Sequence, residues 1–358
     1  MIYQLTYQLN HESEEFARSL GFLQFNPALR NRAIPIRKLV IGASLWMIST
    51  LAMIDVLVKR LLSLFAVVFC VVTITFLLIR ISPGGPFDGE RKIPPAIEKQ
   101  LLQKYKLDGT IWQQYRGYIG DLLCGDLRLS TKYRNRSVNE ILAQTLPVTL
   151  CLGGMAFLLA SIGGVWLGAF AAMHKQTWRD YGAMFLALAA ISLPAYIVGP
   201  LLILVFALTL QCFPAGGWGS ASHLILPSIT LAAPAMAVVA RLMRGSMVEI
   251  LGQDFIRTAR AKGLKESTIV FRHALRMALL PVVSYLGPLA AHLLTGSIVV
   301  ETVFHIPGAG GFFVHSILNR DGFLLGGMVI VYCVMLVVFN LVVDLVYGYL
   351  DPRIQADV

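Results

Sequence analysis

Six long apolar runs dominate the hydrophobic pattern of the chain. Each holds about 20 residues or more with few charges, the length that an α-helix needs to cross the roughly 30 Å hydrocarbon core of a bilayer. The runs are residues 57–81, 146–173, 181–210, 225–243, 278–300 and 323–350. The pattern therefore predicts an all-α polytopic membrane protein with six core transmembrane helices.

The residues before the first run predict a separate N-terminal extension, residues 1–52. Its apolar run has only about 16 residues, which is marginal for a span. Basic residues precede this run and oppose its export. They are Arg30, Arg32, Arg37 and Lys38. We therefore expect an interfacial helix on the cytoplasmic side, or a misassigned start with Met53 as the first natural residue, followed by a first transmembrane helix at 53–81.

Residues 82–145 separate the first two runs and open with the turn-forming sequence SPGGPFDGERKIPP. Apolar residues then follow the i, i+4, i+5, i+8 spacing of an amphipathic helix, and IWQQYRGYIGDLL repeats the pattern. The first set is Ile97, Leu101, Leu102 and Tyr105. We expect a small helical extracytoplasmic cap, which serves either as a folded spacer or as a ligand contact.

The orientation of the spans follows from Lys and Arg in the short loops, which stay in the cytoplasm. The turn MHKQTWRD carries Lys175 and Arg179, and the loop 244–277 is strongly basic, whereas residues 211–224 contain no Lys, Arg, Asp or Glu. We expect both termini of the core to be cytoplasmic, including a short tail at 351–358. The core itself is expected to cover 146–350.

Composition excludes several classes of function. The chain is 56% hydrophobic and 14% charged, unlike a soluble domain, and the cytoplasmic loops explain much of its net charge of +10 without a nucleic-acid groove. No GxxxxGK[ST] sequence is present to hold nucleotide phosphates, and no HExxH or carboxylate cluster predicts a metal. We expect no catalytic residue, cofactor or metal site.

Glycine and proline interrupt the apolar runs at many positions. Gly164 and Gly168 have the GxxxG spacing that lets two helices approach closely. Prolines such as Pro194 and Pro281 leave carbonyl groups unpaired, which favours spans that contact one another or line a wet path. The pattern leaves open whether such a path exists and names no residue that lines it.

The basic loop 244–277 contains the helix-forming stretch DFIRTARAKGL. Asp254 is expected to cap a short helix that runs to Lys262. Gly263 follows at the position where a left-handed backbone is needed, and Leu264 is available to pack back on the helix. A second helix is expected to start near Ser267, with Pro281 at its entry into the fifth span.

The two sides of this short helix differ in character. Phe255, Ile256 and Ala259 lie on one side, whereas Arg257 and Arg260 face elsewhere. A helix with an apolar tip and a basic flank can enter a groove on another protein. The same residues also fit an ordinary basic loop anchored at the lipid headgroups.

The sequence ARAKGL followed by HALRMALLP resembles the cytoplasmic loop of binding-protein-dependent ABC importer permeases. In that family a motif of Glu-Ala-Ala, three residues and Gly docks on the ATPase subunit. Here Arg257, Thr258 and Ala259 stand in the Glu-Ala-Ala places and Gly263 in the Gly place. The general motif matches only at Ala259 and Gly263, but RTARAKGL matches the variant of the peptide and nickel branch.

The resemblance covers roughly residues 53–355 and is greatest to the B-type permease of oligopeptide importers. Its other motifs are GGPFDGER, GDLRLS, TLPVTL, ETVFHIPGAGG, NRD and LDPRI. Two positions depart from the family pattern: Arg128 stands where Gly is common, and Ala309 stands where a bulky aliphatic residue is common.

The resemblance implies a type I ABC importer permease in a bacterial inner membrane, a transport subunit rather than an enzyme. It implies that short peptides are the cargo, that an extracytoplasmic binding protein delivers them, and that a second permease and one or two ATPase subunits complete the importer. The residues expected to couple to the ATPase are Asp254, Phe255, Ile256, Arg257, Thr258, Ala259, Arg260, Ala261, Lys262, Gly263 and Leu264.

Two alternatives remain. The first is an importer of the same class that carries nickel or another small solute in place of a peptide, because the binding protein largely decides the ligand. An ion-coupled secondary transporter is the other alternative, but such proteins commonly place ionisable residues at mid-membrane, and these spans are almost uncharged between their ends.

Overall fold

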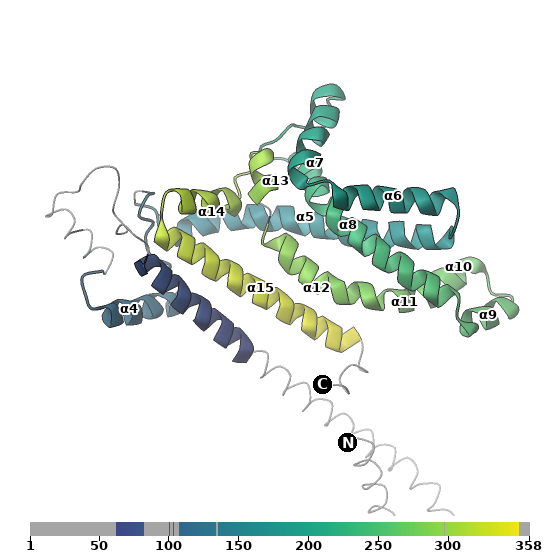
Figure 1. Cartoon of the computed structure of the whole chain (residues 1–358), viewed down its shortest axis with the longest axis horizontal. Coiled ribbons are helices and arrows are strands. Elements are labelled where there is room, and N and C mark those ends of the chain that lie inside the picture. Colours follow the sequence, from purple (N-terminus) through teal and green to yellow (C-terminus); the bar gives the residue numbers. More distant parts are fainter. Residues whose placement is uncertain are drawn as a thin grey trace, which may run out of the picture. The chain divides into compact units, whose positions relative to one another are not determined.

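The computed structural model describes residues 62–81, 100, 103, 107–133, 135–296 and 298–350, with side chains up to 342. The predicted extension 1–52, the amphipathic set around Leu101 and the tail 351–358 lie outside the described residues. Residues 63–351 form one compact unit. Among the described residues every regular element is a helix, and one isolated bridge pairs Leu129 with Ser137 (Figure 1).

The first span is Leu62–Ile81. The helices of the outer segment and the middle of the chain are α4 (Ile111–Leu123), α5 (Val138–Met173), α6 (Trp178–Ser192), α7 (Ala195–Leu202), the π-helix η1 (Ile203–Thr209), α8 (Ser222–Leu251) and α9 (Asp254–Ala261). The remaining helices are α10 (Glu266–Thr268), the π-helix η2 (Ile269–Ala274), α11 (Leu275–Ala278), α12 (Leu280–Leu294), α13 (Ile298–Val303), α14 (Ala309–Leu318) and α15 (Gly322–Leu350).

Four described helices are long and apolar enough to cross a membrane: the first span, α5, α8 and the part of α15 up to Val342. Two bent helix pairs bring the number to six if each pair is one span. Each of the six predicted runs is therefore mainly helical where the structure describes it. At about 1.5 Å per residue the 36 residues of α5 measure about 54 Å, so this helix extends beyond the hydrocarbon core. It begins at Val138 rather than near 146, because Ser137 and Glu140 form a capping box.

The third predicted run, 181–210, does not form one straight helix, and the break lies at Pro194, one of the residues expected to interrupt the runs. The chain turns by 111° between α6 and the pair formed by α7 and η1. The turn lies at Leu193 and Pro194, where Leu193 has an extended backbone (ψ 119°). A proline disfavours helical backbone in the preceding residue, which accounts for the break at this point. Gly199 of α7 then approaches Val303 and Phe304 so closely that an added Cβ would lie 3.0 Å from the Val303 side chain.

The fifth span ends earlier in the structure than the sequence predicts. Glu266–Ala278 and α12 are bent by 52°, with Pro281 at the start of α12 as expected. The helix ends at Leu294 rather than Val300, because Gly296 turns the chain with φ +82°. The residues that follow form the short helices α13 and α14 before α15 begins.

Helices α5 and α8 form the centre of the described unit. They run parallel, since Gly164 of α5 faces Val239 of α8 and Gly168, one turn later, faces Met243. A Cβ added at Gly164 would lie only 2.6 Å from the Val239 Cβ. The prediction that Gly164 and Gly168 allow close helix approach is thus confirmed.

The segment predicted as an outer cap contains α4, which packs along the side of the first span. The Thr73 and Tyr115 hydroxyl groups are 2.7 Å apart, and the Phe76 ring lies 5.2 Å from the Tyr115 ring. Thr73 is eight residues before Ile81, or about 12 Å along the helix. Helix α4 therefore reaches down beside the span rather than covering only its end.

Candidate functional site

Helix α9 coincides with the predicted short helix of the basic loop. Its N-cap is Gln253, so the prediction that Asp254 caps it is wrong; Asp254 is the first helical residue, where its charge favours the helix dipole. The helix ends at Ala261, and Gly263 has φ +75°. The left-handed Gly263 is as predicted, and the Leu264 N–H donates to the Ala259 carbonyl at 3.3 Å, which closes the helix, while the Leu264 side chain stays 42% exposed.

The apolar residues of α9 divide between the interior and the surface. Ile256 is fully buried in the same apolar cluster as Met243 and Met247 of α8, and Ala259 packs against that cluster. Phe255 remains 39% exposed. The predicted apolar tip is therefore mainly an anchor to the chain itself, and Phe255 is the apolar residue of α9 that stays available to a partner.

The other predicted coupling residues lie at the surface and differ in their contacts. Arg260 binds Glu266 of α10 through two hydrogen bonds, 2.6 and 3.2 Å, which join the two sides of the loop. Arg257 has only a long contact of 3.4 Å to Asp254, and both side chains are largely exposed. Exposed pairs of this kind contribute little to stability. Thr258 donates a hydrogen bond to the Asp254 carbonyl, and the exposed remainder comprises Ala261, Lys262, Gly263 and Leu264.

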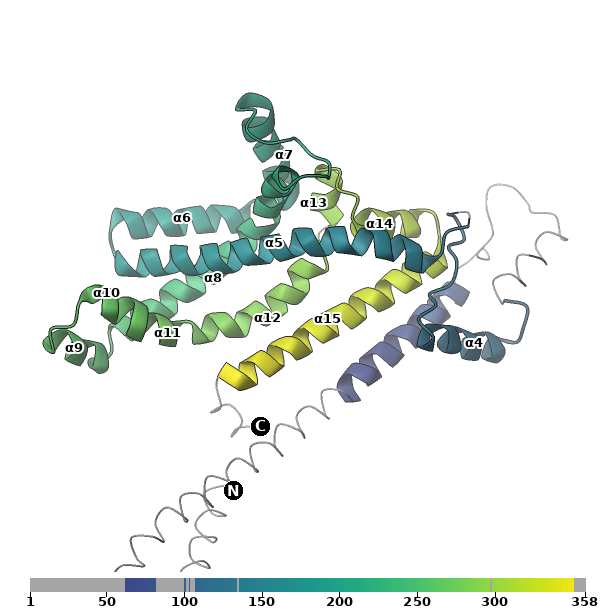
Figure 2. The same cartoon turned by 180° about the vertical axis from the view of Figure 1, so that it is seen from behind.

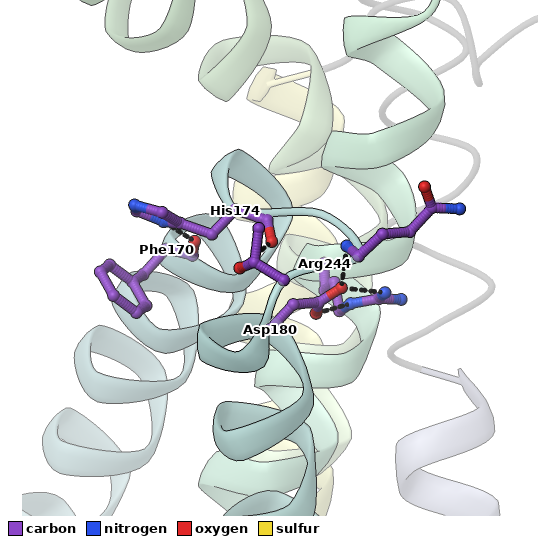
Figure 3. Close-up of polar contacts among 6 residues, drawn as sticks. Phe170, His174, Asp180 and Arg244 are labelled. Carbon is purple, nitrogen blue, oxygen red and sulfur yellow. Dashed lines mark hydrogen bonds and ion pairs between the residues drawn. The ribbon is translucent and has the colours of Figure 1, made fainter.

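A buried ion pair holds the C-terminal half of α8 to α6 (Figure 3). The Arg244 guanidinium donates to both oxygens of Asp180, at 2.6 and 2.7 Å. The Asp180 side chain is only 1% exposed and also accepts the Gln176 N–H at 3.0 Å. This bidentate geometry fixes the α6 start beside the part of α8 that leads into α9.

A second buried carboxylate lies at the other end of α8. Glu301 of α13 accepts the Thr149 hydroxyl of α5 and the Gly310 N–H of α14, each at 2.8 Å. Thr149 in turn accepts the Ala309 N–H at 2.9 Å. A Cβ at Gly308 would collide with the Glu301 carboxylate, so the glycines of PGAGG make room for it. This contact set, the Glu301 knot, joins three helices.

A third contact set joins the outer segment to α15. Asp321 is fully buried and accepts the Ser130 hydroxyl and the Thr131 N–H, the latter at 3.2 Å. Arg128 donates to Asp121 at 2.9 Å and lies over the Tyr118 ring. Arg128 also has φ +69°, a conformation that favours glycine, which explains why the family pattern has Gly at this place.

The sequence pattern indicated the loop around α9, but it did not predict the contacts made by Glu301, Asp321, Asp180 and Arg244. The most distant partner of each lies between 64 and 191 residues away. A local signal existed only for Glu301, which is a lone acid between an apolar run and a glycine-rich turn.

Helix α8 runs from the side of α9 to the region of α7 and α13 (Figure 2). Its C-terminal part shares a buried cluster with Ile256 of α9, and Leu226 near its N-terminus shares another with Val300 and Phe304. The 30 residues of α8 form one uninterrupted helix of about 45 Å. One continuous helix therefore packs against both Ile256 of α9 and the residues Val300 and Phe304 that flank Glu301.

The chain is similar to known proteins over most of its length. The model of the family described as binding-protein-dependent transport system inner membrane component matches residues 164–356. The oligopeptide transport system permease protein OppB of Salmonella typhimurium is 43% identical over 305 residues, 85% of this chain and 100% of the relative. The dipeptide transport system permease protein DppB of Bacillus subtilis is 44% identical over 299 residues, 84% of this chain and 97% of the relative.

A solved structure is similar in fold. It is a chain of the MetNI methionine ABC transporter in an inward-facing conformation, with a TM-score of 0.51 and 16% sequence identity. The match covers 59% of this chain and 96% of that chain. The fold predicted from the sequence, that of a type I ABC importer permease, is confirmed. Together with the family match, these similarities show that the chain belongs to the binding-protein-dependent transport system inner membrane components.

Proposed function

We propose that this chain is a permease subunit of an ATP-driven importer of short peptides. The support is the similarity, 42–44% identity over nearly the whole length of the relatives, to permeases named for oligopeptide and dipeptide transport. The chain has no phosphate-binding GxxxxGK[ST] sequence of its own. ATP hydrolysis is therefore assigned to one or two separate ATPase subunits, and the importer is completed by a second related permease and an extracytoplasmic peptide-binding protein.

In this proposal α9 is the contact with the ATPase. The observation that carries it is the division of the helix: Ile256 is buried in the core, while Phe255 and Arg257 stay exposed. A helix held in this way moves together with the core when a partner pushes on its outer face. Gly263 and the Arg260–Glu266 contact keep the loop in one conformation.

Helix α8 then carries the motion across the membrane. ATP binding brings the ATPases together and displaces α9, and the continuous α8 transmits the displacement to Leu226 and the outer helices α13 and α14. The translocation path opens outward and returns inward after hydrolysis. The basic loop 244–277 is placed in the cytoplasm, as are both ends of the core, because its Lys and Arg content favours that side.

Uptake by the complete importer in vesicles tests this function. We expect accumulation of a labelled short peptide only with ATP, the ATPases and the binding protein, and continued uptake after an ionophore collapses the proton gradient. Gradient-driven uptake by this chain alone would establish a secondary transporter instead. Uptake of nickel in place of the peptide, with the natural binding protein present, would retain the importer class and change the cargo.

A further inference from the structure

A groove of about 390 Å³ lies between the first span and the outer end of α15. Its walls on the first span include Val71, Ile74 and Leu78, and those on α15 include Leu325 and Val329. The two helices lie side by side in both views (Figures 1 and 2). The apolar wall from Val71 to Ile79 is about 12 Å long, more than a third of the roughly 30 Å hydrocarbon core.

Apart from Thr75 in the middle of the first-span wall, the polar groups of this groove gather at one end. Ser316, Arg320 and Asp321 line the groove where α14 ends and α15 begins. Ser316 donates to the Phe313 carbonyl at 2.7 Å, and Asp321 is buried with hydrogen bonds to Ser130, Thr131 and Leu324. The Ser316 and Asp321 side chains therefore already have hydrogen-bond partners within the protein.

Arg320 differs from its neighbours. Its side chain is exposed, and it forms no ion pair with any side chain in the part of the chain that the structure describes. Exposed apolar side chains flank it: Ile317 is 50% exposed and Leu318 is 72% exposed. An arginine beside exposed apolar residues, at the outer end of two spans, is the arrangement expected at the boundary between headgroups and acyl chains.

We propose that this groove binds one anionic glycerophospholipid of the outer leaflet, with its phosphate at Arg320 and an acyl chain between the first span and α15. The charge at one end and the apolar walls along the membrane normal match an amphiphile. An unfilled groove would also forfeit the dispersion contacts that an acyl chain supplies. The orientation of Arg320 toward the outer leaflet rests on the topology included in the proposed function.

Photolabelling of the complete importer tests the site. The complex is placed in vesicles of phosphatidylethanolamine and phosphatidylglycerol that contain a trace of phosphatidylglycerol with a diazirine in its acyl chain. We expect labelled peptides from residues 71–79 and 322–329. Arg320→Gln should lower this labelling by about five-fold, the factor expected for one basic residue next to an anionic lipid. Leu78→Trp should lower it by filling the groove.

Two matched variants control for general effects. Arg80→Gln removes another exposed arginine at the outer end of the first span, and Leu77→Trp adds the same bulk beside Leu78; neither residue lines the groove. Both should keep the labelling of wild type. Equal losses for Arg320→Gln and Arg80→Gln, or label spread evenly along the first span, would overturn the proposal.

Occupation of the groove by the second permease would also overturn it. A short cross-link from Leu78→Cys to the second permease, together with no lipid label at residues 71–79, would show that the second permease occupies the groove. Peptide uptake is measured on the same vesicles. A complex that takes up peptide with ATP but shows no label in the groove contradicts only the lipid site, whereas loss of ATP-driven uptake in wild type contradicts the proposed function.

Discussion

Removal of the Glu301 side chain should loosen the outer end of the permease. Glu301→Ala deletes both acceptors of the Glu301 knot and leaves the Thr149 hydroxyl and the Gly310 N–H without them. Each buried group left unsatisfied costs about 1–3 kcal/mol, so the two together cost about 2–6 kcal/mol. Glu301→Gln offers one acceptor oxygen in place of two and should fall between Glu301→Ala and wild type.

The assay is the half-life of the monodisperse complex at a fixed elevated temperature, because large membrane complexes unfold irreversibly. We expect Glu301→Ala to shorten this half-life by about ten-fold or more. Thr302→Ala is the matched control, since Thr302 is exposed and its hydroxyl bonds only to Ile298 in its own helix. A Glu301→Ala complex as durable as wild type would refute the role of the knot.

A double-mutant cycle separates the knot from general effects of burial. Thr149→Ala removes the hydroxyl that Glu301 accepts and that also accepts the Ala309 N–H. Residues in direct contact couple by about 0.5–3 kcal/mol, so the double variant should lose less than the sum of the single variants. Strictly additive losses would show that the two side chains act independently.

The knot should also respond to pH. Burial raises the pKa of the Glu301 carboxyl above its ordinary range, against the opposing hydrogen bonds from Thr149 and Gly310. The folded state therefore holds this proton more tightly than the unfolded state, and the resulting stability is present below the ordinary carboxyl pKa. It is lost as pH rises through the raised pKa. Glu301→Gln should flatten this part of the pH profile of the half-life. An unchanged profile would mean that titration of Glu301 does not contribute to the stability of the complex.

The remaining predictions concern the inner end. Gly263→Val should abolish peptide uptake while the subunit still inserts, because φ +75° is strained for a β-branched residue; full uptake at normal expression would exclude the α9 lever. Arg257→Glu should weaken copurification of the ATPase, and unchanged copurification would mean that Arg257 does not meet it. Asp180→Ala should shorten the half-life of the complex by an amount equivalent to about 1–3 kcal/mol, less than for a fully buried pair because Arg244 is 31% exposed. Gly164→Leu should abolish uptake by separating α5 from α8, since even a Cβ would lie 2.6 Å from Val239.

The sequence located the spans because hydropathy depends only on local composition, but it did not locate their ends. Helix α5 starts at Val138, and the capping sequence SVNE at 137–140 was the local signal for that start. Proline was a weaker guide. Pro194 breaks the third span, whereas Pro147 stays inside α5 and Pro227 inside α8. The surrounding packing decides whether the carbonyl freed by a proline is tolerated within a helix.

Local patterns did not predict the contacts of the buried carboxylates. Glu301 and Asp321 both lie near turns between apolar segments, a position that is typical of solvent-exposed loop residues. Their partners, Thr149 and Ser130, are 152 and 191 residues away. The fold brings TLPVTL next to ETVFHIPGAGG, and GDLRLS next to NRD. These contacts give a physical reason for motifs that lie far apart along the chain.

The α9 loop illustrates what a helical pattern can and cannot decide. Its length and its left-handed glycine follow from local backbone preferences, and both were predicted within one residue. The side of the helix that meets a partner was not predicted. Phe255 and Ile256 are adjacent apolar residues, and only the position of α8 determines which one is buried.

Since Ile256 anchors α9 to the core, a partner surface must contact α9 mainly through Phe255 and its polar neighbours. Phe255→Ala should therefore weaken ATPase binding without destabilising the permease, whereas Ile256→Ala should destabilise the permease itself, by about 2–5 kcal/mol for a fully buried isoleucine. Half-life and ATPase copurification measured on both variants distinguish the two roles, and equal effects of the two substitutions on either measurement would contradict the division of the helix.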